Sequence, residues 1–204
     1  MAITTYTLPL NTSWKLSDNF IGVADVSGVY TAATLGAPFS TTTLPAVTIE
    51  QQLGQVVKAV SYDTTYGGAA LFIFLAVPTS TTVTQGLVYN WLGNGTIVVN
   101  PTAVSSQAVS GTPVAVAINT VASNASSIQY TWFLVQGRGA ALKGATLTAQ
   151  PNAPLFISGV TAGRVRTTAS VYRTFIGLRG ANVATATGSI LPVWLQFPSN
   201  GPGI

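Results

Sequence analysis

The arrangement of apolar residues constrains this chain more than any other feature. From about residue 64, short runs of β-branched and aromatic residues alternate with clusters of glycine, proline, asparagine and serine, and no long stripe has a 3.6-residue period. This pattern predicts an all-β protein, either an antiparallel β-sandwich or a jelly-roll-like β-barrel. The predicted strands are residues 55–60, 69–77, 87–91, 96–99, 114–118, 129–136, 140–142, 155–157, 170–178 and 191–197.

Three local patterns add detail. Residues 93–95 read Gly-Asn-Gly between two apolar runs, and these residue types tolerate the positive φ of a tight hairpin. Residues 130–135 are largely apolar on both alternating faces, which predicts a strand buried on both sides, in this chain's own core or against another subunit. Residues 49–53 are the one helix candidate, and Gly54 cuts it short.

The first fifty residues differ from the rest because their large apolar residues stand singly among threonines and prolines. We therefore predict an extended N-terminal arm over residues 1–50, a β-sandwich domain over 51–198 and a flexible tail over 199–204. In the arm, Trp14, Phe20 and Tyr30 are candidates for insertion into pockets of a neighbouring chain. The alternative is that they fold back on the sheet of their own chain.

Charge is scarce and unevenly placed. Charged residues make up 6% of the chain, against roughly 25% in an ordinary soluble domain. All four acids precede residue 64, so residues 1–63, with two lysines, sum to −2 and residues 64–204, with six bases, sum to +6. A basic region without acids suits an acidic protein surface or nucleic acid, and we expect no direct contact with nucleic acid.

The arginines are the remaining interface candidates: Arg138, Arg164, Arg166, Arg173 and Arg179. Spacing places Arg164 and Arg166 on one face of a strand, and Arg173 stands among aromatic residues as in some nucleic-acid binders. The more ordinary interpretation is that these arginines are solvated and protect strand edges from aggregation. Arg138, between two glycines, reads as a solvated residue of a turn.

Catalytic and metal-binding patterns are missing from the sequence. The chain has no histidine or cysteine, and Asp63 reads as a turn residue rather than one of a converging carboxylate pair. A Ser–Lys dyad with Lys15, Lys58 or Lys143 stays open, although no spacing favours one. The glycines from 137 to 144 fail the phosphate-loop pattern, because Ala145 stands where lysine is required. We expect no catalytic residues, metal or cofactor.

The longest purely apolar run, residues 69–77, is about half the ~20 residues of a membrane-spanning helix. The N-terminus lacks the basic start and apolar core of a secretory signal. We therefore expect no membrane partner and synthesis in a host cytoplasm.

From Gly54 to Pro198 the order of features resembles a family of bacteriophage capsid decoration proteins, also described as cement or head-associated proteins. The segments that carry the resemblance are GQVVKAV (54–60), YGGAALFIFL (66–75), QGLVY (85–89), QYTWFLVQGR (129–138), PLFI (154–157) and VWLQFP (193–198). The resemblance implies an oligomeric, most simply trimeric, β-domain on the outer surface of an icosahedral head. Its partners would be the major capsid protein and copies of itself.

The leading hypothesis is a non-enzymatic virion protein that stabilises the capsid by bridging major capsid proteins. The alternative is a receptor- or glycan-binding module of a head fibre, tail fibre or tailspike. Its candidate sugar-stacking residues are Trp91, Tyr130, Trp132 and Tyr172, for which burial in a core is the commoner role. A lytic or esterase-like virion enzyme ranks last.

Overall fold

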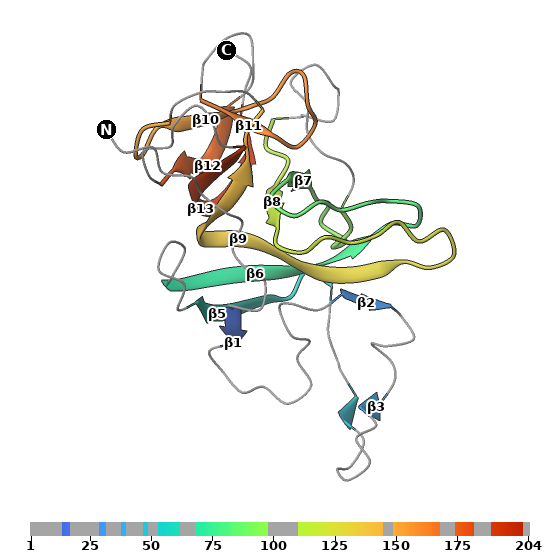
Figure 1. The fold of residues 1–204 in the computed structure, drawn as a ribbon. Coiled ribbons are helices and arrows are strands. Elements are labelled where there is room, and N and C mark those ends of the chain that lie inside the picture. Colours follow the sequence, from blue (N-terminus) through green and yellow to red (C-terminus); the bar gives the residue numbers. More distant parts are fainter. Residues whose placement is uncertain are drawn as a thin grey trace.

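The computed structural model of the protein (Figure 1) describes residues 14–16, 29–31, 38–39, 47–48, 53–61, 68–97, 110–144, 149–167, 174–181 and 189–201. For the four segments before residue 53, and for Ser61, it describes the backbone alone. The helix candidate at 49–53 falls on other residues except for Leu53, which lies in a turn. The predicted flexible tail at 199–204 begins too early, because Ser199 and Asn200 end the last strand and Asn200 is buried. Residues 202–204 of that tail lie outside the described residues.

The described elements are all strands, which confirms the all-β class. They are β1 (Trp14–Leu16), β2 (Val29–Thr31), β3 (Pro38–Phe39), β4 (Val47–Thr48), β5 (Val56–Ser61), β6 (Gly68–Val77), β7 (Val88–Asn90), β8 (Val114–Ala117), β9 (Gln129–Leu142), β10 (Pro154–Ile157), β11 (Val165–Arg166), β12 (Thr174–Gly180) and β13 (Ile190–Asn200). The strands predicted from short apolar runs at 55–60, 69–77, 114–118 and 155–157 match β5, β6, β8 and β10 within a residue or so.

Eleven of the strands form one antiparallel sheet. Its main path runs β1-β5-β6-β9-β13-β12-β10-β11, while β2 pairs with β9, and β7 reaches β9 through β8. Within the described residues the path does not close into a barrel, and β3 and β4 form a separate two-stranded sheet.

The long strand β9 organises the sheet. Its first half pairs with β6, from Gln129 opposite Val77 to Gln136 opposite Leu71. Its second half pairs with β13, from Gln136 to Leu142. Figure 1 shows β9 running beside β6 and then bending upward alongside β13, so this one strand joins both parts of the sheet.

The predicted turn around Arg138 is wrong, because β9 continues through it. The register with β6 shifts opposite this point, between Leu71 and Phe72, which marks a β-bulge. Gly137 has φ +109°, and a Cβ there would lie 2.8 Å from the Cβ of Ala70. Glycine here serves the bulge and the close approach of β6 rather than a reversal of the chain.

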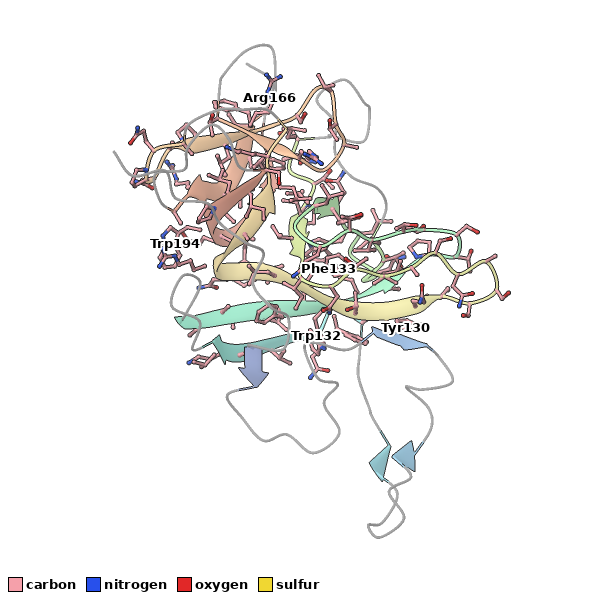
Figure 2. All side chains as sticks on the ribbon, viewed as in Figure 1. Tyr130, Trp132, Phe133, Arg166 and Trp194 are labelled. Carbon is pink, nitrogen blue, oxygen red and sulfur yellow. The ribbon has the colours of Figure 1, made fainter. Side chains whose placement is uncertain are left out.

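Burial on both faces of β9 is confirmed. Trp132 packs in one apolar cluster with Phe72 and Phe74, whereas Phe133 packs in a second cluster with Ile73 and Tyr89. The labelled side chains of Trp132 and Phe133 lie on opposite sides of β9 in Figure 2. Both clusters are formed within this one chain, so the apolar faces of this strand are covered without another subunit.

The predicted hairpin at residues 93–95 is also confirmed. Trp91 and Ile97 form an antiparallel bridge across it, and the Leu92 N–H donates to the Thr96 carbonyl at 2.9 Å. Gly95 has φ +78°, and the side chain of Asn94 accepts from the Thr96 N–H at 3.1 Å. Gly95 thus adopts the expected positive φ, whereas Asn94 has no positive φ and contributes its side-chain acceptor.

Candidate functional site

A row of three large side chains crosses three adjacent strands. Trp194 of β13 lies opposite Arg179 of β12 on one side and opposite Arg138 of β9 on the other. Directly opposed residues project to the same face of a sheet. The Arg138 guanidinium lies 6.0 Å from the centre of the Trp194 ring, within cation–π distance.

Trp194 is an exposed residue of β13 that lies between two buried ones. Val193 and Leu195 are buried in the core, whereas Trp194 is 51% exposed and Gln196 is exposed as well. Figure 2 shows Trp194 on the outside of the molecule, beside β13. An indole held in this way combines a rigid apolar face with access from solvent.

A bulge between β12 and β13 shapes the surface next to Trp194. The register of the two strands shifts between Ile176 and Leu178. Gly177 has φ +75°, and a Cβ there would collide with the Gln196 carbonyl oxygen. Phe197 has φ +43°, a conformation that non-glycine residues rarely adopt, and its side chain is exposed. Unusual backbone conformations are thus concentrated at one edge of the row.

An open pocket of about 470 Å³ lies at this row. Its lining side chains include Trp194, Arg179, Gln136, Gln196 and Asn152. Arg179 donates from Nη1 to the Asn152 carbonyl at 3.1 Å, a contact that orients the guanidinium. The volume is within the range of small-ligand sites, roughly 300–1,000 Å³.

The pocket offers two kinds of polar group. Arginine presents up to five N–H donors and no acceptor, which suits a carboxylate or phosphate. The amides of Gln136, Gln196 and Asn152 each present both donors and an acceptor. No acid occurs after Asp63 in the sequence, so this part of the chain supplies no carboxylate of its own to the arginines.

The other predicted arginines do not join this row. Figure 2 shows Arg166 at the β10–β11 end of the molecule, well away from Trp194. Arg164 is half-buried, and its Nη1 donates to the Lys143 carbonyl at 3.0 Å, so this guanidinium serves an internal contact. Arg173 lies outside the described residues.

The three aromatic residues of the predicted arm are only partly placed. The backbone of Trp14 pairs with Ser61 in β5, and the backbone of Tyr30 pairs with Tyr130 in β9. Short pieces of the first fifty residues therefore add to the main sheet. Phe20 lies outside the described residues.

The aromatic residues predicted as candidates for sugar stacking are mostly buried or half-buried where the structure describes them. Trp132 is fully buried, Tyr130 stacks on Phe74 at 6.1 Å between ring centres, and Trp91 is half-buried against the second apolar cluster. Tyr172 lies outside the described residues. Sequence reasoning overlooked Trp194, although the two-residue period of a strand places it on the face of Gln196, opposite to Val193 and Leu195.

The lysines give no clear sign of a Ser–Lys dyad. Lys143 is buried, and this burial lowers its pKa below the ordinary value of 10.5. Nearby Ser158 accepts from the N–H groups of Val160 and Thr161 at 3.3 and 3.1 Å, which closes a turn. Lys58 is exposed on β5.

Three further observations do not assign the chain to a known class of protein. Among the described residues, no group of three or more histidine, cysteine, aspartate or glutamate side chains is placed to hold a metal ion. The described part of the chain also has no helix of the length and apolarity needed to cross a bilayer. The chain matches no known family model, no curated protein and no solved structure.

Proposed function

We propose that this chain is a non-enzymatic structural protein of a bacteriophage particle that binds the outer surface of the capsid and bridges major capsid proteins. The observation that carries the proposal is the charge of the sheet domain: residues 64–204 contain six bases and no acid. Carboxylate partners for these bases must come from the first 63 residues or from other molecules. The ordered resemblance over residues 54–198 to capsid decoration proteins supports the second source.

The packing of the sheet suits a load-bearing role. β6 and β9 carry apolar clusters on both faces, and every strand pair of the sheet is antiparallel. Such a domain resists deformation because core side chains are close-packed and each strand is held by a ladder of hydrogen bonds. In the proposed assembly, the domain is a jelly-roll-like sandwich that forms a trimer on the capsid.

The first fifty residues are proposed as the arm that reaches adjacent capsomers, with Trp14, Phe20 and Tyr30 as its anchors. The charge of +6 on residues 64–204 contributes electrostatic attraction, which salt screens over about 10 Å at 0.1 M. Binding to the capsid should therefore weaken as salt is raised.

The proposal is tested on phage capsids prepared with and without the protein. Bound protein should raise the temperature at which capsids release their DNA, and a capsid-binding assay should show the salt dependence. Light scattering of the purified protein should report a trimer. Equal heat resistance of the two capsid preparations, or no binding at low salt, would overturn the proposal.

A further inference from the structure

We infer that the pocket beside Trp194 binds a carboxylated sugar, such as a hexuronic or sialic acid residue of a surface polysaccharide. This activity goes beyond the proposed capsid binding and does not depend on it. The inference is based on an exposed indole, an oriented arginine and three amide side chains around one pocket of about 470 Å³.

The indole supplies the apolar contact. A pyranose ring has faces of C–H groups, and these pack on a flat aromatic ring. Trp194 is half-exposed and lies opposite Arg179 and Arg138 across the strands. Neighbours on both sides restrict its side chain, so little conformational freedom is lost when a ligand binds.

Arg179 supplies the charge contact. Its side chain is exposed, and one N–H is used by the Asn152 carbonyl at 3.1 Å. A guanidinium has five N–H donors in a planar fork, so donors remain for both oxygens of a carboxylate. The chain's formal net charge of +4 also favours approach of an anionic ligand.

The amides suit a ligand that carries hydroxyl groups beside its carboxylate. Carboxylate side chains only accept hydrogen bonds, and arginine alone would satisfy them. Sugar hydroxyls both donate and accept, and Gln136, Gln196 and Asn152 do the same around the pocket. Gln136 and Gln196 are register partners on β9 and β13, so both amides project to the same face as Trp194.

Two glycines with close strand contacts form part of the pocket wall. Gly177 lines the pocket, and a side chain there would collide with the Gln196 carbonyl. Gly137 also lines it, at the bulge of β9. Both glycines combine positive φ with a lining position, and each Cβ position is occupied by neighbouring strands of the same sheet.

The experiment measures binding of four probes to the full-length protein by isothermal titration calorimetry. The probes are trigalacturonic acid, sialyllactose, the neutral sugar galactotriose and a triglutamate peptide. We expect saturable binding of at least one acidic sugar, with galactotriose and the peptide at least tenfold weaker. Trp194→Ala should weaken acidic-sugar binding at least tenfold, whereas Trp194→Phe should retain most of it.

Arg179→Gln should remove the preference for acidic over neutral sugar while leaving the fold intact. The matched control is Phe197→Ala, which removes an aromatic side chain of similar exposure from the same strand but outside the pocket lining. Thermal unfolding of each variant confirms that it is folded. The inference is overturned if neither acidic sugar binds at millimolar concentration, if triglutamate binds as well as the sugars, or if Phe197→Ala lowers affinity as much as Trp194→Ala.

Discussion

Replacement of Gly137 by alanine tests the bulge that carries β9 from β6 to β13. Two effects oppose this substitution. A side chain at positive φ costs roughly 1–2 kcal/mol, and Gly137 has φ +109°. The new Cβ would also lie 2.8 Å from the Ala70 Cβ and 2.9 Å from the Ala69 carbonyl oxygen, and such crowding costs about 1–3 kcal/mol. We expect Gly137→Ala to lower the free energy of unfolding by about 2–5 kcal/mol.

Two other glycines separate these effects. Gly111 has φ +83° with open space around its Cβ position, so Gly111→Ala measures the backbone cost alone. Gly93 has open space and no positive φ, so Gly93→Ala should raise the free energy of unfolding by about 0.4–1 kcal/mol, through the stiffer unfolded chain alone. Each glycine-to-alanine change also stiffens the unfolded chain, an offset of about 0.4–1 kcal/mol shared by all three variants.

The assay is urea unfolding followed by tryptophan fluorescence, with thermal unfolding as a second measurement. For a chain of this size each kcal/mol corresponds to about 2–4 °C in Tm. The expected order of destabilisation is Gly137→Ala, then Gly111→Ala, then Gly93→Ala. If Gly137→Ala were no more destabilising than Gly111→Ala, β9 would not approach β6 as described and the bulge would be misplaced.

Two further perturbations address the core and the buried lysine. Trp132→Ala should lower the free energy of unfolding by about 3–5 kcal/mol because Trp132 is fully buried. Trp194→Ala on the surface should change the free energy of unfolding by less than about 0.5 kcal/mol. Equal effects of the two substitutions in urea unfolding would contradict the assigned burial. Burial lowers the pKa of Lys143, so between the folded and unfolded pKa values the unfolded chain binds more protons and stability rises with pH. Lys143→Met should therefore stabilise the protein at neutral pH. The same substitution should reduce the rise in the free energy of unfolding with pH up to pH 10.5. An unchanged dependence of the free energy of unfolding on pH would refute the lowered pKa of Lys143.

The strands were predictable because their signals are local. Short apolar runs bounded by glycine, proline, asparagine or serine predicted β6, β8 and β10, and glycine and asparagine at 93–95 predicted a hairpin. Burial of residues 130–135 on both faces was readable for the same reason. Composition also showed, without any coordinates, that the basic residues after residue 63 have no acidic neighbours in that part of the chain.

The course of β9 was not predictable in the same way. Gly137 and Gly139 read as turn residues, since local sequence favours that role for paired glycines. Their actual role depends on Ala70 and Leu134, which lie close to them in the folded sheet. A close approach between strands distant in sequence has no local signature.

The candidate site was likewise decided by tertiary structure. Arg138, Arg179 and Trp194 are far apart in the chain and become neighbours only through the registers of β9, β12 and β13. The sequence by itself determined the all-β class, the charge imbalance and the individual strands, because each is a property of one segment or of a sum over residues. Only the tertiary structure decided which of the described tryptophan side chains is exposed and which arginines stand beside it, because strand register is set by long-range pairing and by bulges.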